Sequence, residues 1–345
     1  MTMARKKGGG ERRQRAKQRA QYDELDKYPV LPPHAFARIV RDRTTLNIIY
    51  QIIEPPMTKK EQEQRDEIMD IFIRSLTANI EEIDSNHDAY VRAAMDKVIK
   101  AYSMKINKKS KSKIFYYLRR DLIGYGQMDV LMNDVNVEDI SLDGTNVPIF
   151  AYHRKFESVE TTCVWETDHA LESYVIKLAQ RCGKHISVAS PLLDATLMDG
   201  SRIVMKLGRE VSTRGSAFCI RRFKDDPFSP ADIVAFRTMS SLMTAYLWIA
   251  FQNEVPMLFV GGTASGKTTT LNAMCIFIPW QMKIVSIEST REVNIPQPNW
   301  VPGLTRQGFG GESSDGEIGE FELLKAALRE RPEYIIVGEI RGAEA

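Results

Sequence analysis

The sequence has few residues of the kinds that form metal sites and disulfides. Its 345 residues include four cysteines, all far apart, and five scattered histidines. Because there is no C-x-x-C pair and no helical H-x-x-x-H spacing, the sequence argues against a zinc site and offers no other metal ligands of this kind. We therefore expect reduced, buried thiols, as in a cytosolic protein.

Long apolar runs and a secretory leader are absent as well. The most apolar long stretch, residues 242–260, is interrupted by three polar residues and Pro256, so it lacks the ~20 unbroken apolar residues of a membrane span. No apolar segment follows the basic N-terminus, which argues against a signal peptide. With 43% hydrophobic and 27% charged residues, the chain has a globular composition and a length sufficient for two domains.

Acidic residues are scarce at the N-terminus and in slight excess elsewhere. Residues 1–20 contain eight Lys or Arg and one Glu, for a charge of +7; the whole chain carries +2, so the remainder carries −5. We expect residues 1–22 to be a disordered basic tail, because they have too few apolar side chains to form a core. Such a tail suits attraction to anionic lipid or nucleic acid, or is simply a solvated leader, and the sequence leaves these alternatives open.

The middle of the chain divides into two parts by its pattern. Residues 23–123 are expected to be a helical N-terminal region, since apolar residues recur at helical spacing from Glu61 onward. Residues 124–224 alternate apolar and polar residues on both sides of the hairpin dipeptide Asp143-Gly144, with one helix expected over 167–181. This pattern predicts an α+β domain with a mostly antiparallel sheet.

After a proline-containing linker, residues 225–230, the pattern changes again. A helix, a strand over 257–260, a Gly-rich loop and a second helix are expected, followed by strand, loop, helix and strand. This alternation predicts a parallel sheet connected by helices over residues 231–345. The fold class is therefore α/β.

The segment GGTASGKTT fits the phosphate-binding motif G-x-x-x-x-G-K-[ST]. Its glycines let backbone N–H groups point at phosphate oxygens. Lys267 adds a positive charge for the β- and γ-phosphates, and the Thr268 hydroxyl is suited to binding Mg²⁺. We predict a nucleotide and Mg²⁺ site formed by Gly261, Gly262, Thr263, Ala264, Ser265, Gly266, Lys267, Thr268 and Thr269.

Two expected strands of the same part end in carboxylates. Glu288 follows residues 284–287, with Glu292 one helical turn on, and Glu339 follows residues 334–337. The carboxyl ends of parallel strands converge on the crevice where ligands bind, so two such acids downstream of a phosphate-binding loop favour a catalytic role. In the second strand, Gly338 stands where an Asp is usual.

Together, GGTASGKTTT, VSIESTREV and LRERPEYIIVGEIRG resemble the secretion-type ATPases, which power type II and type IV secretion, pilus assembly and, in archaea, the archaellum. The upstream segments GYGQMDVLMNDVNVEDISLDGTNVPIFAYHRKF and STRGSAFCIRRF are similar to the archaeal branch. The resemblance implies a helical and α+β N-terminal part followed by an incomplete RecA-like domain. It also implies a chain cut short in that domain, with an uncovered sheet edge, because the family continues beyond this point.

The resemblance carries roles for individual residues. Glu339 matches the Walker B glutamate that helps to activate water, and Glu288 and Glu292 match acids of the family's Asp box. Ser289 departs from the pattern, since this box usually has an Asp there. In this family, arginines of the N-terminal domain act on nucleotide, some of them across subunits. Here Arg202 matches the motif, and Arg214 and Arg221 lie in similar strands. The alternative for each arginine is a surface salt bridge.

These features predict an ATP-hydrolysing motor subunit of a secretion, type IV pilus-like or archaellum system, which couples Mg-ATP hydrolysis to motion between its domains. The resemblance implies a hexameric ring at the cytoplasmic face of the membrane, acting on a polytopic platform protein. Anionic lipid is a further expected partner through the basic tail, and nucleic acid is the less expected alternative. Two alternatives stay open: a conjugation-type ATPase that moves DNA or protein, and a non-hydrolysing nucleotide-binding scaffold, which Ser289 favours.

Overall fold

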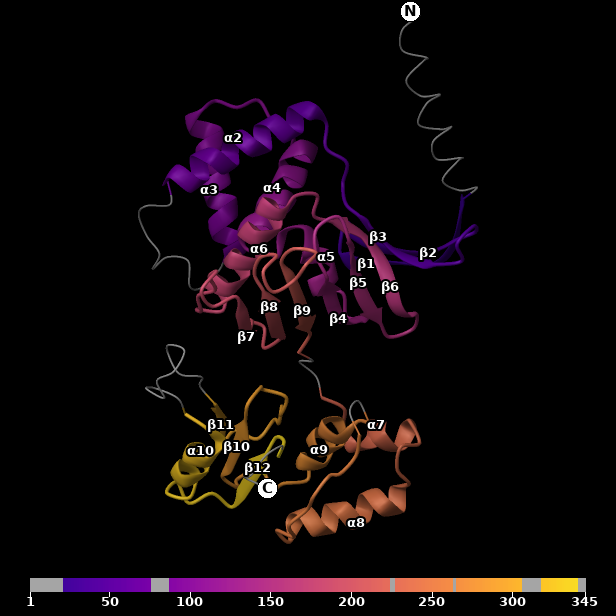
Figure 1. Ribbon diagram of the computed structural model, residues 1–345, viewed down its shortest axis with the longest axis vertical. Helices are drawn as coiled ribbons and strands as arrows, with labels where there is room; N and C mark the ends of the chain where they lie inside the picture. Colours follow the sequence, from indigo (N-terminus) through magenta and orange to yellow (C-terminus); the bar gives the residue numbers. More distant parts are fainter. Residues whose placement is uncertain (1–20, 76–86, 224–226, 263–264, 306–317, 341–345) are drawn as a thin grey trace, which may run out of the picture. The chain divides into compact units, whose positions relative to one another are not determined.

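A nine-stranded sheet dominates the first part of the chain in the computed structural model, which describes residues 21–75, 87–223, 227–262, 265–305 and 318–340 (Figure 1). The strand order is β1-β2-β3-β6-β5-β4-β9-β8-β7. The registered pairs are antiparallel except for β3 with β6. The strands are β1 (Tyr22–Leu31), β2 (Ala35–Asp42), β3 (Ile48–Ile53), β4 (Val137–Leu142), β5 (Pro148–His153), β6 (Glu157–Val164), β7 (Leu192–Thr196), β8 (Arg202–Lys206) and β9 (Ala217–Arg221).

The expected helical region over 23–123 is wrong in its first third, which forms β1, β2 and β3. Strand β2 alternates in burial, with Ala35, Ala37 and Ile39 fully buried. This period of two was readable in the sequence and favours a strand. The three strands are tied to the rest of the sheet by Asp134, whose Oδ2 accepts hydrogen bonds from the Tyr28 and Tyr50 hydroxyls at 2.6 Å each.

A three-helix bundle follows these strands. It consists of α2 (Lys59–Ser75), α3 (His87–Ala101) and α4 (Lys108–Leu122), and its core includes Ile68, Met95 and Ile114. Helix α4 starts where the Asn107 side chain accepts the Ser110 N–H at 2.8 Å, a standard N-cap. The helical pattern read from residue 61 onward is confirmed as far as the described residues go, since residues 76–86 lie outside them.

The α+β pattern over 124–224 is confirmed element by element. Strands β4 and β5 form the hairpin around Asp143-Gly144, and the expected helix is α6 (Asp168–Arg181), whose N-cap is Thr167. Only β7 and two short helices, η2 (Gly126–Met128) and α5 (Asp129–Asn133), were not expected. All four cysteines are free, but only Cys163 and Cys275 are buried, so the expectation of buried thiols holds for half of them.

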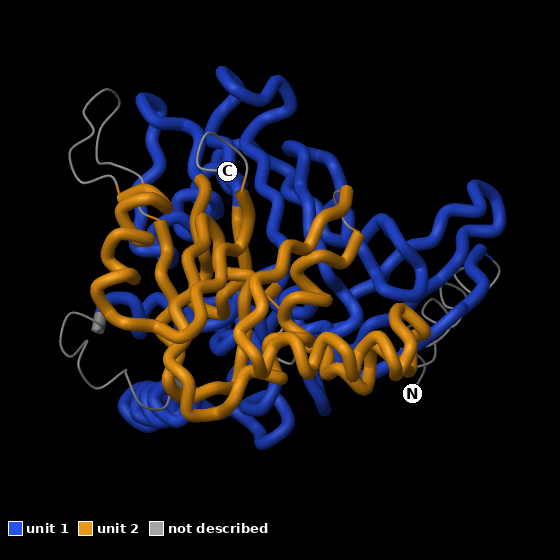
Figure 2. The backbone as a smooth tube through the Cα atoms, turned by 90° about the horizontal axis from the view of Figure 1, so that it is seen from below, with its two compact units in different colours: residues 1–193, 204–222 blue, residues 194–203, 223–345 orange. Residues whose placement is uncertain are grey.

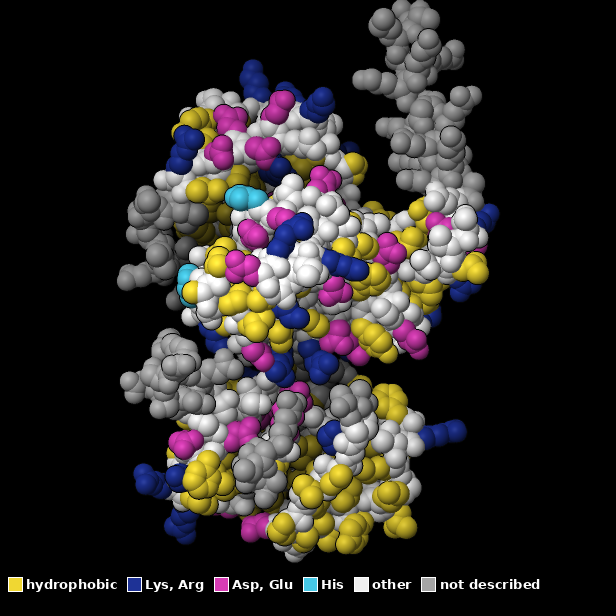
Figure 3. Space-filling model, in the orientation of Figure 1, with side chains coloured by type: hydrophobic (Ala, Val, Ile, Leu, Met, Phe, Trp, Pro, Cys, Tyr) yellow, Lys and Arg dark blue, Asp and Glu magenta, His cyan; other side chains and the backbone are white. Residues whose placement is uncertain are grey.

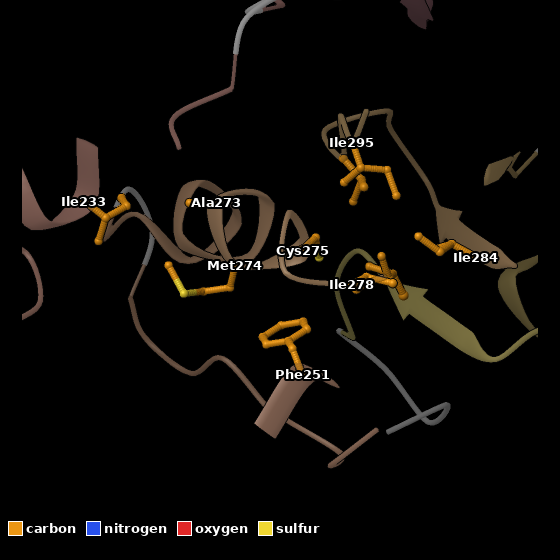
Figure 4. Close-up of a cluster of buried hydrophobic side chains, with 10 residues drawn as sticks. Ile233, Phe251, Ala273, Met274, Cys275, Ile278, Ile284 and Ile295 are labelled. Carbon is orange, nitrogen blue, oxygen red and sulfur yellow. The ribbon is translucent and has the colours of Figure 1, made fainter. Parts of the chain in front are cut away.

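The last part of the chain forms an α/β layer around a three-stranded parallel sheet in the order β11-β10-β12. Strand β10 is buried at all five positions, as expected of a central parallel strand. A core of Phe251, Met274, Ile278 and Ile284 joins the helices to this sheet (Figure 4). The elements are α7 (Pro230–Ala235), α8 (Ser241–Gln252), α9 (Lys267–Cys275), β10 (Ile284–Glu288), β11 (Trp300–Leu304), α10 (Glu320–Ala327) and β12 (Tyr334–Val337).

The strand expected over 257–260 is not formed within the described residues. The segment keeps the alternation of a strand, because Met257 and Phe259 pack on the core while Leu258 and Val260 are exposed. It is not one of the three hydrogen-bonded strands of the sheet, and a strand needs a neighbour to which it can hydrogen-bond. Figure 3 shows a related feature, apolar side chains exposed over α8.

Contacts divide the chain into two units, residues 1–193 with 204–222 and residues 194–203 with 223–345 (Figure 2). The division after residue 222 lies near the expected linker at 225–230. Residues 225 and 226 of this linker are outside the described residues, and its last residue, Pro230, already belongs to α7. The expected basic tail lies outside them except for its last two residues. No helix in the described segments combines the length and apolar character needed to span a bilayer.

Candidate active site

The phosphate-binding motif forms a tight loop that leads into α9. Gly266 has φ +88°, a left-handed conformation that residues with a Cβ rarely adopt, and α9 begins at the next residue. At Gly261, an added Cβ would come within 2.6 Å of the Ser265 hydroxyl oxygen, so the loop curls closely on itself. Thr263 and Ala264, which the sequence also assigns to this site, lie outside the described residues.

The charge at the mouth of the loop comes from Lys267. Its Nζ donates to the carbonyl oxygens of Gly261 at 2.9 Å and Gly262 at 2.8 Å, so the ammonium group folds back over the loop. In the described part of the chain no side chain caps α9, and its first turn contains no acid. The first N–H groups of a helix are natural ligands for an anion, so the loop, its lysine and the helix end fit a bound phosphate.

The two threonines after Lys267 lie in the first turn of α9. Thr268 is half-buried and Thr269 is exposed. A hydroxyl at the start of this helix is an oxygen ligand of the kind that Mg²⁺ accepts alongside phosphates, so Thr268 remains the candidate for the metal. Its role stays a prediction.

The carboxyl ends of β10 and β12 meet, as the sequence predicts for parallel neighbours. The Gly338 N–H donates to the Ile287 carbonyl oxygen at 2.9 Å. Just beyond this pair of residues, the Ser289 hydroxyl donates to Glu339 Oε1 at 3.4 Å. Glu339 is half-buried, so its carboxylate lies at the end of the sheet and keeps access to solvent.

Glu288 lies in a different environment from Glu339. It is 1% exposed, and its Oε1 accepts the N–H groups of Glu292 at 2.8 Å and Val293 at 2.7 Å. Burial raises the pKa of Glu288 above its usual range, against the two hydrogen bonds that lower it. The carboxylate therefore holds the turn after β10. This geometry favours a positioning role, and the catalytic role assigned from the sequence stays a prediction. Glu292, the other acid of this segment, is exposed.

Two residues of this site were missed from the sequence. Asn272 on α9 donates to the Glu292 carbonyl oxygen at 2.8 Å and accepts the Asn294 N–H at 3.2 Å, which joins the phosphate-binding helix to the turn after β10. Arg291 lies in that turn with its guanidinium 5.3 Å from the Trp300 ring centroid. Only the position of Asn272, four residues after Thr268, could have suggested its place beside the site.

The three arginines assigned from the sequence lie on β8, on β9 and in the turn between them. Arg202 forms a salt bridge with Asp194 at 2.6 Å, and Arg221 contacts Asp139 at 3.2 Å. Arg214 is exposed, and its carbonyl oxygen accepts the Thr145 N–H at 2.9 Å. The salt bridge that was the alternative interpretation is thus present for Arg202 and Arg221. A role of the three arginines on nucleotide stays a prediction.

The chain resembles known proteins over most of its length. The protein MJ0900 of Methanocaldococcus jannaschii is 36% identical over 323 residues, which cover 92% of this chain and 57% of that protein. The type IV secretion system protein VirB11 of Bartonella henselae is 30% identical over 195 residues, 47% of this chain and 54% of VirB11. This chain thus spans little more than half the length of either relative.

Among solved structures, the ATPase DotB of Legionella pneumophila matches 63% of this chain and 59% of its own, with 18% identity and a TM-score of 0.41. That likeness is too low to carry an argument about function. The sequence match is more telling: residues 152–345, more than half of the chain, fit the model of one family, and they include the phosphate-binding loop and both strand-end glutamates. The chain therefore belongs to the Type II/IV secretion system protein family.

Proposed function

We propose that the chain is the ATP-hydrolysing part of a secretion, pilus-like or archaellum motor, as the motifs predict. The observation that carries the proposal is the phosphate-binding loop, where Lys267 lies over the mouth of the loop and no described side chain caps the start of α9. A glutamate at the end of a parallel sheet accompanies it in the same unit. Loop, helix end and acid are the parts that phosphoryl transfer to water requires.

Each residue of the site has a role in this proposal. The backbone N–H groups at the start of α9 and the Lys267 ammonium bind the phosphates, for which Lys267 exchanges its contacts with Gly261 and Gly262. The Thr268 hydroxyl would hold Mg²⁺, which when bound would supply positive charge to the phosphates. Glu339 orients the attacking water, and the Ser289 hydroxyl holds the Glu339 carboxylate. Glu288 supports these groups by fixing the turn after β10.

The larger assembly belongs to the proposal as well. Membership of the family supports a hexameric ring that works beside the membrane, on its cytoplasmic side, against a membrane platform protein. In such a ring Arg202, Arg214 and Arg221 would stabilise charge on the γ-phosphate. Hydrolysis would then move the two units of the chain against each other.

The test is ATP hydrolysis by the full-length protein with Lys267→Ala and Glu339→Gln. Lys267→Ala is expected to weaken ATP binding, because it removes the charge at the phosphates. Glu339→Gln is expected to keep binding and to slow phosphate release by about 100-fold or more, the usual effect of losing a general base. Matched controls are Lys325→Ala on α10 and Glu254→Gln after α8, both outside the site. Wild-type turnover in both site variants would refute the assignment.

One relative favours a second candidate, a conjugation-type ATPase that moves DNA or protein, because VirB11 is a type IV secretion system protein. Stimulation of hydrolysis by DNA in the full-length protein would support this candidate. Tight ATP binding without phosphate release would instead support the non-hydrolysing scaffold.

A further inference from the structure

We propose that the lysine-rich end of the α2–α4 bundle docks the protein on an anionic lipid bilayer. At this end, drawn uppermost in Figure 1, the start of α2, the end of α3 and the start of α4 come together. The segments concerned, residues 57–60 and 97–113, contain nine lysines, no arginine and no acidic residue. We call these two segments the lysine end.

Most of this charge faces solvent. Lys111 pairs with Asp96 at 2.6 Å, and Lys113 contacts Glu61 at 3.4 Å. The other seven lysines are all exposed, and Figure 3 shows Lys and Arg side chains over the bundle, with Asp and Glu side chains between them. They are Lys59, Lys60, Lys97, Lys100, Lys105, Lys108 and Lys109.

The lysine end is held together as one platform by Glu61. Its Oε2 accepts the Thr58 N–H at 2.8 Å, which closes a capping arrangement at the start of α2. Its Oε1 accepts the Ser110 hydroxyl of α4 at 2.7 Å. The Lys113 Nζ adds a bond to the Pro56 carbonyl oxygen at 2.8 Å. Because the same carboxylate joins the starts of both helices, the lysines of α2 and α4 are presented on one rigid surface.

The lysines at the starts of α2 and α4 are placed against helix stability. Helix starts carry a partial positive charge and favour acids, yet α4 has three lysines and no acid in its first four residues. Lys59 and Lys60 open α2, where Glu61 follows them in the same turn, whereas Lys97 and Lys100 lie near the end of α3, where positive charge is favourable. A charge arrangement that costs the fold some stability, and in which most members have no ion pair among the described residues, is the kind that is kept for binding an anionic partner.

The chemistry of the patch favours a bilayer over nucleic acid. Nucleic-acid surfaces use arginine forks and stacked aromatic rings, and the lysine end has no arginine. Lysine is a compact, hydrated point charge, which suits diffuse attraction to an anionic membrane. The one large exposed aromatic side chain of the lysine end is Tyr102, which lies between α3 and α4 and is 59% exposed. Tyrosine is favoured at membrane interfaces.

Vesicle co-sedimentation of the full chain tests the proposal. The variant changes Lys60, Lys105, Lys108 and Lys109 to Gln, and vesicles of phosphatidylcholine with phosphatidylglycerol are compared with phosphatidylcholine alone. We expect binding to the anionic vesicles only, a partition coefficient about tenfold or more lower in the Gln variant, and retention in a Lys→Arg variant at the same positions. A matched control changes four exposed lysines of the same unit that lie outside the bundle, Lys27, Lys155, Lys184 and Lys206, and should bind as the wild type does.

Three results would overturn the proposal. The first is equal binding by the Gln variant and the wild type, which would leave the attraction to residues 1–20 alone. The second is an equal loss in the control, which would make the effect one of net charge. The third is preferential binding of duplex DNA that the Gln variant loses, which would make this a nucleic-acid surface. The inference gives the membrane contact of the proposed function a location, and since vesicle binding needs no ATP, its failure is distinct from a failure to hydrolyse ATP.

Discussion

Ser289 and Glu339 lie at the ends of two neighbouring parallel strands, with the serine hydroxyl 3.4 Å from Glu339 Oε1. The residue that departs from the family pattern is thus a neighbour of the acid proposed to orient water. A hydroxyl here donates to the glutamate, whereas an aspartate would repel it. The serine therefore changes how Glu339 is held, and it still provides a polar side chain where the family usually has an aspartate.

Replacing Ser289 by Ala is expected to affect the chemical step more than nucleotide binding. The change removes one donor to Glu339, so we expect kcat to fall by about tenfold or less, because an acid that is less well positioned is a weaker base. The Kd for Mg-ATP should stay within about twofold, since Ser289 does not belong to the phosphate-binding loop. Steady-state hydrolysis and equilibrium binding measure the two effects separately, and a loss confined to binding would contradict the contact.

Gly338 has no room for a side chain. A Cβ at this position would lie 2.9 Å from Glu288 Cγ, which explains why a glycine precedes Glu339. Gly338→Ala should lower the free energy of unfolding of the second unit by about 1–3 kcal/mol, the usual effect of overpacking a buried site. Gly262→Ala is the control for stability, since a Cβ there meets nothing within 4 Å. Denaturant unfolding measures both, and equal stability of the two variants would contradict the close approach.

The pH dependence of stability should report on Glu288. Burial raises the pKa of its carboxyl in the folded chain above the usual 4.5, so the folded state holds this proton more tightly than the unfolded state. Its contribution to stability is therefore complete below pH 4.5 and is lost as the pH rises through the folded pKa. Glu288→Gln keeps an acceptor for both N–H groups and has no such loss. We expect the variant to gain stability relative to the wild type as the pH rises through this window, measured by denaturant unfolding at a series of pH values.

Glu61 should behave in the opposite way. Hydrogen bonds from Thr58 and Ser110 lower the pKa of Glu61 to about 2, so its contribution is complete above its ordinary pKa of 4.5 and is lost as the pH falls from there towards 2. In Glu61→Gln the bundle should be less stable at neutral pH and should lack this part of the acid destabilisation. Glu63→Gln, at an exposed position of the same helix, is the control. Equal pH profiles for the two variants would contradict the role of Glu61.

The sequence predicted those elements whose pattern is local. The hairpin at Asp143-Gly144, the bundle helices and the loop before α9 follow from turn chemistry, periodicity and glycine spacing, and the structure contains them. What it missed depends on long-range contacts. Strands β1 to β3 belong to the large sheet through pairing and through Asp134, which lies about 80 residues or more from its partners Tyr50 and Tyr28.

The same difference between local patterns and long-range contacts applies to the candidate site. Both strand-end glutamates were found from their positions, but their environments were not, because burial depends on the turn that folds back over Glu288. Nothing local in the sequence distinguishes a glutamate that binds two backbone N–H groups from one that faces solvent. The strand expected over 257–260 failed for a related reason, since an alternating pattern forms a strand only where a neighbour offers hydrogen bonds.

The position of Lys267 with nucleotide bound tests the proposed function most directly. The measurement is a structure of the full-length protein with Mg²⁺ and a non-hydrolysable ATP analogue. We predict phosphates held by the N–H groups at the start of α9, with Lys267 moved from the Gly261 and Gly262 carbonyl oxygens onto the β- and γ-phosphates, and with Glu339 facing the γ-phosphate. A structure in which Lys267 keeps both carbonyl contacts while the analogue binds elsewhere, or in which Glu339 faces away from the γ-phosphate, would contradict it.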